Sequence, residues 1–360
     1  MRRYLFFVNQ PYSYSILRPL QEQIRLRGDE AAWFVAGCTA APLRSDELHL
    51  KTVKQVMEFK ADATFVPGDW VPYFFPGIKV EVFHGMARNK RGHSSENESD
   101  HYRIRGWFDL YCTHAERDTA KFQELAEKHG HFAVSKTGWP KLDPLMGLGV
   151  RGPRQRADDE CPMVFFASTF STAVTAAPAL ADQIEALSKS GRWKFMVTLH
   201  PKMDPGIVER YRNMASESLR FIESDEDLIP LLPEADVMLC DTSSIMFEFM
   251  FLDRPVVTFR TKMPGSYLLD VSEAGELERA LIEAELRPPA MLAEAEKLCL
   301  ELHSYNDGSS SERVLNAVEC HLDQPPNLLP KPRNYIRKLK VRRRLAKELR
   351  KTQRRLVGRG

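Results

Sequence analysis

Two histidines and one hydroxyl-rich segment have the residue types and positions that group-transfer chemistry needs. His84 and His200 each follow a short apolar run, and so does Asp241-Thr-Ser-Ser244. A neutral imidazole can take a proton from a hydroxyl, and an imidazolium can stabilise charge on a phosphate. Hydroxyls and backbone N–H groups at a strand-to-helix turn can bind an anion. The pattern therefore indicates proton transfer at a hydroxyl beside an anion-binding turn.

Each of these features also has a structural alternative. Asp241, Thr242 or Ser243 could cap the helix expected to follow, because these residue types are favoured at N-caps. An isolated histidine at a strand end is usually structural. Two histidines at strand ends in opposite halves of the chain, facing one presumed cleft, favour the catalytic interpretation instead.

The elements that must position these residues alternate along the chain. The sequence predicts strands at 4–8, 32–36, 64–66, 80–83, 132–136, 163–167, 194–199, 219–222, 237–240 and 256–259. It predicts helices at 15–27, 48–60, 114–129, 177–190, 206–216, 243–252, 273–286, 290–303 and 309–322. Such alternation is typical of an α/β fold with parallel sheets covered on both faces. We therefore expect two Rossmann-like domains with an interdomain cleft, in which ligands bind outside the carboxyl ends of the strands.

The expected domain boundaries follow from breaker residues and charge. The predicted organisation is an N-terminal Rossmann-like domain at 1–146, a linker at 147–160, a second Rossmann-like domain at 161–324, and a Pro-rich hinge with a basic amphipathic tail at 325–360. The linker assignment rests on Gly147-Leu-Gly-Val-Arg-Gly-Pro153 and the charged run after it.

Composition narrows the class of protein. The chain has 360 residues, 43% hydrophobic and 28% charged, and no run long enough to span a membrane. Its six cysteines are scattered without a Cys-x-x-Cys pair, and the apolar run at the start is too short for a signal peptide. Phosphate-loop, dinucleotide-turn and nucleophile-elbow motifs are absent from the sequence. These observations predict a cytoplasmic α/β protein with reduced thiols.

The tail differs sharply from the rest in charge. Residues 331–360 hold 14 Lys and Arg against one acid, Glu348, whereas the whole chain has a net charge of only +2. In a helix starting near Asn334, a narrow apolar stripe would comprise Tyr335, Ile336, Leu339, Ala346, Leu349 and Leu356. Such a segment suits an anionic membrane surface, which predicts a peripheral location on the inner membrane face. One alternative is a solvated charged tail. The other is nucleic-acid binding, which the acidic body and the lack of a reader motif disfavour.

Six segments, taken in order, resemble a known family. They are His84-Gly85 with the basic loop after it, Thr137-Gly-Trp-Pro-Lys-Leu-Asp143, Phe166-Ala-Ser-Thr-Phe170, His200-Pro201, Asp241-Thr-Ser-Ser244 and Asp307-Gly-Ser-Ser-Ser-Glu-Arg313. The set resembles the CDP-glycerol glycerophosphotransferases, the teichoic-acid primase and polymerase group, over roughly residues 75–320. The resemblance implies a GT-B fold and transfer of glycerol phosphate from CDP-glycerol to a hydroxyl of a cell-envelope glycan or lipid-linked acceptor, with release of CMP.

The resemblance also implies roles for domains and residues, with 1–146 as the acceptor-side domain and 161–324 as the nucleotide-donor domain. His84 would be the general base on the acceptor, and His200 would stabilise charge on the donor phosphates. The implied donor phosphate and nucleotide site comprises Ser168, Thr169, Lys202, Asp241, Thr242, Ser243, Ser244 and Arg313. The implied acceptor or cleft residues are Gly85, Arg88, Lys90, Gly138, Lys141 and Asp143.

Departures from the family pattern leave alternatives for the substrate. Thr242 stands where the family usually has tyrosine, and Ser168 stands where it has proline. The donor could therefore be another CDP-alditol such as CDP-ribitol, and the short N-terminal half favours a single addition over polymerisation. One rival is a GT-B glycosyltransferase that uses a CMP-sugar, and another is a catalytically silent scaffold with the same fold. No tightly bound cofactor or metal site is predicted, and the sequence does not determine a divalent-metal requirement or the oligomeric state.

Overall fold

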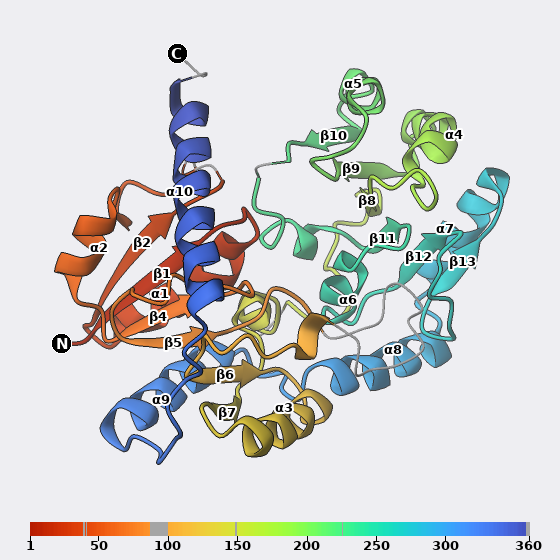
Figure 1. Ribbon diagram of the computed structural model, residues 1–360. Helices are drawn as coiled ribbons and strands as arrows, with labels where there is room; N and C mark the ends of the chain where they lie inside the picture. The colour runs from red at the N-terminus through yellow and green to blue at the C-terminus, as the bar shows by residue number, and fades with distance from the viewer. Residues whose placement is uncertain (39, 41, 87–99, 148–149, 225, 358–360) are drawn as a thin grey trace. The chain divides into compact units, whose positions relative to one another are not determined.

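The computed structural model describes residues 1–38, 40, 42–86, 100–147, 150–224 and 226–357. The described residues form two compact units. Unit 1 is built from residues within 1–143 together with 301–357, and unit 2 from residues within 144–300. Figure 1 shows a sheet with helices around it in each unit.

Unit 1 contains a seven-stranded parallel sheet in the order β3-β2-β1-β4-β5-β6-β7. The strands are β1 (Arg3–Val8), β2 (Glu30–Val35), β3 (Leu48–His49), β4 (Ala63–Val66), β5 (Ile78–Glu81), β6 (Leu110–Thr113) and β7 (Ala133–Lys136). Continuous apolar runs such as Tyr4–Val8 are buried along their whole length, as expected for strands covered on both faces.

Five α-helices belong to the described part of unit 1. They are α1 (Ser13–Leu26), α2 (Val53–Phe59), α3 (Glu116–His129), α9 (Ser310–Asp323) and α10 (Tyr335–Val357), with short 3₁₀ turns at Asp100–Tyr102 and Pro140–Leu145. Tyr14 of α1 stacks on Trp33 of β2. On the opposite face of the sheet, Phe7 and Phe34 pack in one cluster with side chains from α2, α3 and α10.

Unit 2 contains a six-stranded parallel sheet in the order β10-β9-β8-β11-β12-β13. Its strands are β8 (Met163–Ser168), β9 (Lys194–Leu199), β10 (Leu219–Ile222), β11 (Val237–Cys240), β12 (Val256–Phe259) and β13 (Leu269–Val271). In both units the order runs 3-2-1-4-5-6 in local strand numbering, which is that of the Rossmann fold. The expected pair of Rossmann-like domains is confirmed.

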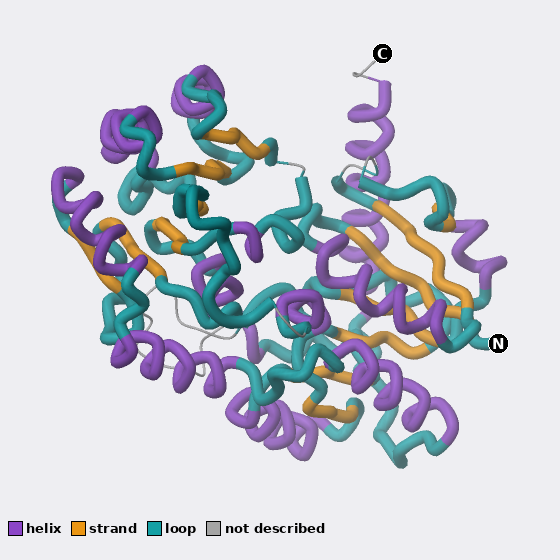
Figure 2. Tube along the Cα trace, turned by 180° about the vertical axis from the view of Figure 1, so that it is seen from behind, coloured by secondary structure: helices purple, strands orange, loops and turns teal. Residues whose placement is uncertain are grey.

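The helices of unit 2 pack against this sheet. They are α4 (Ala177–Lys189), α5 (Pro205–Asn213), α6 (Ile245–Met250), α7 (Leu277–Glu285) and α8 (Pro289–Leu302), with 3₁₀ turns at Leu232–Glu234 and Ala274–Glu276. The core gathers Ile184 of α4, Tyr211 of α5 and Leu281 of α7 around the strands. Figure 2, coloured by secondary structure, shows helices, strands and long loops along the trace.

All ten predicted strands are present, with ends that shift by up to two residues. Three further strands, β3, β6 and β13, were not predicted, because each has only two to four residues and lacks a distinctive apolar run. The predicted helix over 48–60 is shorter: Leu48–His49 pairs with β2 as a strand, and Thr52 then caps α2 by accepting a hydrogen bond from the Gln55 N–H. Tertiary pairing overrides local helical preference there.

The compact units differ from the predicted domain boundaries at the end of the chain. Residues 301–324, expected in the donor domain, belong to unit 1. Helix α9 lies against α1, where Arg27 pairs with Glu319 at 2.9 Å. The predicted linker also packs on unit 2, since the Gly152 N–H donates to the Leu252 carbonyl at 2.7 Å.

The basic tail forms the expected helix, α10, but it is docked on unit 1 through a different stripe. Val341 and Leu345 are 6% and 4% exposed in the core of unit 1, whereas Ile336 and Leu339 of the predicted stripe are 74% and 51% exposed. The predicted apolar stripe and the docked stripe share only Leu349. The sequence prediction therefore placed the apolar face of α10 on the wrong side of the helix. Among the helices of the described residues, none combines the length and hydropathy of a membrane-spanning segment.

Candidate functional site

In unit 2, Ser168 and Asp241 lie at the carboxyl ends of β8 and β11, the neighbouring strands at which the strand order reverses. Asp241 is fully buried, and its Oδ2 accepts hydrogen bonds from Ser168 Oγ (2.6 Å), the Thr169 N–H (2.9 Å) and the Ala176 N–H (3.1 Å). Burial raises the pKa of Asp241. Asp241 therefore organises the loop after β8 from below.

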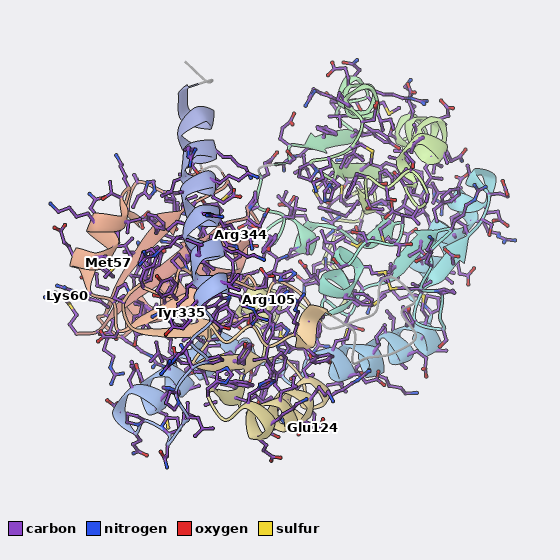
Figure 3. The ribbon with its side chains drawn as sticks, viewed as in Figure 1. Met57, Lys60, Arg105, Glu124, Tyr335 and Arg344 are labelled. Atoms are coloured by element: carbon purple, nitrogen blue, oxygen red, sulfur yellow. The ribbon has the colours of Figure 1, made fainter. Side chains whose placement is uncertain are left out.

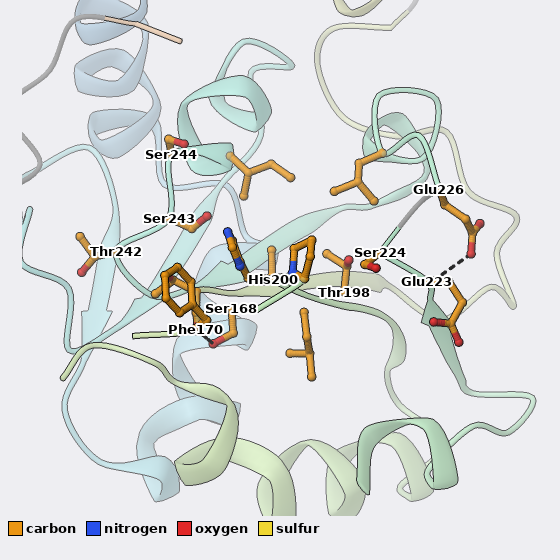
Figure 4. Close-up of a pocket in the computed structure, with 16 residues that line it drawn as sticks. Ser168, Phe170, Thr198, His200, Glu223, Ser224, Glu226, Thr242, Ser243 and Ser244 are labelled. Carbon is orange, nitrogen blue, oxygen red and sulfur yellow. Dashed lines mark hydrogen bonds between the residues drawn. The ribbon is translucent and has the colours of Figure 1, made fainter. Parts of the chain in front are cut away.

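A cavity of about 390 Å³ opens above this point (Figure 4). Its lining comes from the ends of four strands, β8, β9, β10 and β11: Ala167, Ser168, Thr169, Phe170, Thr198, Leu199, His200, Pro201, Glu223, Ser224, Glu226, Leu228, Thr242, Ser243, Ser244 and Ile245. The volume is in the range of small-molecule sites. Five of the eight predicted donor residues line this one cavity together with His200, and Asp241 supports its floor.

His200 has a defined tautomer in this cavity. Its Nδ1 accepts a hydrogen bond from the backbone N–H of Lys202 at 3.1 Å, and its ring lies 4.4 Å from the ring of Phe170, centroid to centroid. Burial and, secondarily, the charge of Lys202 lower the pKa of His200. At neutral pH the imidazole is therefore neutral with its proton on Nε2, from which it can donate to an anion.

The hydroxyl segment after β11 lines the cavity. Thr242 Oγ1 accepts a hydrogen bond from the Lys262 N–H at 3.0 Å, which fixes this turn. Ser244 occupies the N-cap of α6, yet within the described residues its side chain makes no capping hydrogen bond. The N-cap is therefore none of the three residues named in the capping alternative, and Ser243 and Ser244 both line the cavity.

Figure 4 shows Ser243, His200 and Phe170 at one end of the cavity and Glu223 and Glu226 toward the other. The two glutamates were not predicted as site residues. Glu223 receives two hydrogen bonds from Arg212, at 3.0 Å each, and Glu226 receives one from Arg220 at 2.9 Å. Both carboxylates are held by arginine and contribute acceptor oxygens at the rim of the cavity.

Two further side chains complete the cavity wall. Phe170 is 40% exposed, and Lys202 places its Nζ 5.4 Å from the centre of the Phe170 ring. Lys202, a predicted donor residue, thus stands beside the cavity without being one of its lining residues. Phe170 belongs to a quoted family segment, and an exposed aromatic at a strand end is the signal that could have identified it.

In unit 1, His84 lies in the loop after β5 and beside the corresponding reversal of strand order. Its ring stacks on Tyr12, which follows β1, with centroids 5.4 Å apart. Its Nδ1 is 3.3 Å from the carbonyl oxygen of Pro67, which follows β4. A proton on Nδ1 is donated to that carbonyl, which leaves the basic lone pair on Nε2, as a general base requires.

Behind His84 lies a group of buried histidines. Burial lowers the pKa of His101 and of His303 to about 4 each, and holds the pKa of His114 well below its usual value. His101 and His114 both pack on the ring of Phe83, the residue before His84. Phe83 has φ +56°, a conformation that costs energy for a bulky residue and that this packing maintains. These histidines are neutral structural supports.

Two predicted acceptor residues, Gly138 and Asp143, contact the C-terminal segment of unit 1, and a third, Lys141, lies over the Trp139 ring. Gly138, at φ +80°, leaves room that a Cβ would fill, only 2.5 Å from Ser310 Oγ. Asp143 accepts hydrogen bonds from the N–H groups of Ser310 (2.9 Å) and Ser311 (2.7 Å) at the start of α9, and burial raises its pKa to about 6. Lys141 places its Nζ 5.3 Å from the centre of the Trp139 ring.

The remaining predicted residues lie elsewhere. Arg313, predicted to contact donor phosphate, is part of unit 1, where it pairs with Asp307 and lies 3.7 Å from the centre of the Tyr305 ring. Gly85 directly follows His84. Arg88 and Lys90 lie outside the described residues.

Comparison with known proteins shows which family this chain resembles. The family model described as CDP-Glycerol:Poly(glycerophosphate) glycerophosphotransferase matches residues 64–320. A segment of 132 residues is 25% identical to the teichoic acid glycerol-phosphate primase of Bacillus subtilis (strain 168). That segment spans 34% of this chain and 34% of the primase, so the match extends over about a third of the primase's length.

Solved structures share the fold at low sequence identity. A structure of the wall teichoic acid polymerase TagF has a TM-score of 0.65 at 12% identity, covering 90% of this chain and 89% of that one. The S. aureus MnaA structure with UDP has a TM-score of 0.61 at 14% identity, covering 92% and 99%. These similarities confirm the expected GT-B class of α/β fold. Because the family model matches more than half of its residues, the chain belongs to the CDP-glycerol:poly(glycerophosphate) glycerophosphotransferase family and is a transferase.

Proposed function

We propose that this enzyme transfers glycerol phosphate from CDP-glycerol to a hydroxyl of a cell-envelope glycan or lipid-linked acceptor and releases CMP. The observation that carries the proposal is the unit 2 cavity, where His200 and the Ser243 and Ser244 hydroxyls meet at the reversal of strand order in a chain of this family. Rossmann-type sheets bind nucleotides at this point. A TagF structure obtained after soaking with CDPG is among the structures with this fold.

Different residues of the cavity are proposed to bind different parts of the CDP-glycerol donor. His200 donates its Nε2–H to a pyrophosphate oxygen, and the hydroxyls of Ser243 and Ser244 donate to the same group. Lys202 adds positive charge beside it, and the exposed ring of Phe170 offers a face for the cytosine base. The carboxylates of Glu223 and Glu226, at the other end, can accept hydrogen bonds from ribose hydroxyls.

The chemical step needs one base and charge stabilisation. His84 Nε2 takes the proton of the acceptor hydroxyl as its oxygen forms a bond to the phosphorus of the glycerol phosphate. The bond from that phosphorus to the bridging oxygen breaks, and CMP leaves with the electron pair. Phosphoryl transfer is accelerated chiefly by alignment and by neutralising charge on the phosphates, the task assigned here to His200.

The acceptor side is proposed to include Gly85, Arg88, Lys90 and Lys141 in addition to His84, with Gly138 and Asp143 holding the start of α9 in place. Arg313 stays a candidate phosphate contact, held beside Asp307 in unit 1. The similarity to a protein named as a primase supports the addition of a single unit.

The proposed reaction is tested by mass spectrometry of the products formed from CDP-glycerol and cell-envelope lipid extracts. An acceptor heavier by one glycerol phosphate, formed together with CMP, is the expected result. A parallel incubation with CMP-sugars addresses the rival glycosyltransferase. Transfer of sugar without transfer of glycerol phosphate contradicts the proposal, and so does donor binding without turnover of any donor.

The hydroxyl segment gives a prediction for donor affinity. Ser243→Ala and Ser244→Ala should each weaken CDP-glycerol binding by about 1 kcal/mol, and by more if the lost hydrogen bond is to a charged oxygen. Isothermal titration calorimetry measures this. Ser190→Ala, which removes an exposed hydroxyl after α4, is the control and should bind donor like the parent protein. Unchanged affinity in both cavity variants would remove this segment from the donor site.

We further propose that the outward face of α10 rests on an anionic membrane surface. Lys340, Arg343 and Lys347 recur along one exposed face, continuous with Ile336 and Leu339. This face is opposite the docked side chains Val341 and Leu345, since residues at i+3, i+4 and i+7 share a face. Each such cation near an anionic surface can contribute about 1 kcal/mol.

The membrane proposal predicts loss of vesicle binding on charge reversal. The triple variant Lys340→Glu, Arg343→Glu and Lys347→Glu should no longer sediment with phosphatidylglycerol vesicles at low salt, while its turnover on a soluble acceptor is kept. The matched control reverses Lys51, Lys54 and Lys128, three exposed lysines outside α10, and changes the net charge equally. Equal sedimentation of the two triple variants would overturn the proposal. Deletion of residues 331–360 is unsuitable, because it removes Val341 and Leu345 from the core.

A further inference from the structure

The second half of α10 reaches the carboxyl edge of the unit 1 sheet. Thr352 Oγ1 accepts a hydrogen bond from the N–H of Gly37, directly beyond β2, at 2.8 Å. One turn after the buried Val341, Arg344 lies over Trp70 of the loop after β4, with its guanidinium carbon 4.4 Å from the ring centroid. Ligands of open parallel sheets bind at this edge. The helix therefore contributes side chains to the region where His84 stands.

Arg344 and His84 share neighbours. The loop from Pro67 to Trp70 provides both the carbonyl that fixes His84 Nδ1 and the ring that supports Arg344. Tyr12, stacked on His84, is close enough to Arg344 for the two to interact electrostatically. Burial, assisted by Asp69, raises the pKa of Tyr12 to about 12, and Arg344 acts in the opposite direction. Tyr12 thus connects Arg344 with His84.

Arg344 is suited to bind an anion. It is exposed, and stacking on an indole ring holds the guanidinium flat while its edge N–H groups can still donate. Within the described part of the chain, it forms no ion pair with a carboxylate. Arg105, in the loop before β6, is instead paired with Asp69 at 3.1 Å. Figure 3 shows the places of Arg344 and Arg105 beside the helix.

We propose that Arg344, on α10, binds a phosphate group of the acceptor beside His84 and so selects for acceptors that carry a phosphate. The guanidinium fork holds the phosphate through two parallel hydrogen bonds, and the polyol hydroxyl extends past Tyr12 to His84. This inference rests on the proposed function, because it names a further residue that binds the acceptor at the same site. It assigns to α10 a part in substrate binding distinct from its outward face.

The inference is tested first by binding, which requires no turnover. The full-length protein is titrated with glycerol 3-phosphate, with glycerol as the neutral control, by isothermal titration calorimetry. Arg344→Ala should weaken glycerol 3-phosphate binding at least 10-fold, and Arg344→Lys should lie between it and the parent protein. Arg337→Ala, seven residues earlier on the same row of α10, is the matched control and should bind normally. Unchanged binding in Arg344→Ala, or equal weakening in Arg337→Ala, overturns the inference.

Kinetics and vesicles separate this inference from the other proposals. With a phosphate-bearing soluble acceptor, Arg344→Ala should raise the acceptor KM at least 10-fold while the KM for CDP-glycerol and the unfolding temperature stay unchanged. If no protein transfers glycerol phosphate, the proposed function fails, and the calorimetry still decides the role of Arg344. Loss of vesicle sedimentation in Arg344→Ala with unchanged glycerol 3-phosphate binding would assign the arginine to lipid headgroups and overturn the inference.

Discussion

Replacing His200 by alanine is expected to lower turnover with CDP-glycerol by at least about 100-fold, the usual effect of losing one donor to developing charge. The residue is positioned for this effect because its Nδ1 is occupied by the Lys202 N–H, which directs the Nε2–H toward the cavity. Steady-state kinetics of CMP release measure the effect.

The His200 prediction has a matched control within the same loop. Met203→Leu changes a buried side chain three residues later without removing a hydrogen-bond donor from the cavity, and it should keep turnover close to that of the parent protein. Donor affinity, measured separately, should fall in His200→Ala. A folded His200→Ala protein with normal turnover would show that the histidine has no part in the reaction.

Replacing His84 by alanine is expected to lower turnover by about 10²- to 10⁴-fold, the range for loss of a general base. Its effect should differ in kind from that of His200. Because His84 belongs to unit 1 and the donor cavity to unit 2, calorimetry should show unchanged CDP-glycerol affinity in His84→Ala. Added imidazole should restore part of the activity by replacing the missing base.

Two results would contradict the role assigned to His84. One is turnover within a few fold of the parent protein in a folded His84→Ala variant. The other is loss of donor affinity equal to that in His200→Ala, which would place His84 in donor binding. His129→Ala, which removes a histidine at the end of α3, serves as the control and should leave transfer intact.

The sequence predicted the sheets well because buried parallel strands appear as short, continuous apolar runs. Segments such as 163–167 and 194–199 needed no tertiary information to be recognised. The two-residue strand β3 could not be recognised, since its conformation depends on pairing with β2. The assignment of α9 and α10 to unit 1 was equally inaccessible, because it depends on contacts across some 300 residues of sequence.

The site residues could be predicted where chemically suitable side chains directly follow a predicted strand. His200 and the Ser243–Ser244 hydroxyls were found in this way, and one cavity brings them together. Glu223 was missed because acidic residues are common in loops, and only the fold brings this one to the cavity rim. Arg344 was missed for the opposite reason: within a long basic run, one arginine is indistinguishable from its neighbours until Trp70 is seen beneath it.

The construction of unit 1 from both ends of the chain has a consequence for biosynthesis. The described residues of unit 2 all lie within 144–300, so its core can form as soon as that segment has left the ribosome. The apolar cluster of the first 143 residues is completed later, because it includes Val341 and Leu345, which are translated some 200 residues afterwards. Until α10 has been synthesised, part of the apolar cluster of the N-terminal sheet therefore stays exposed to solvent. Chaperone binding is most needed during that interval.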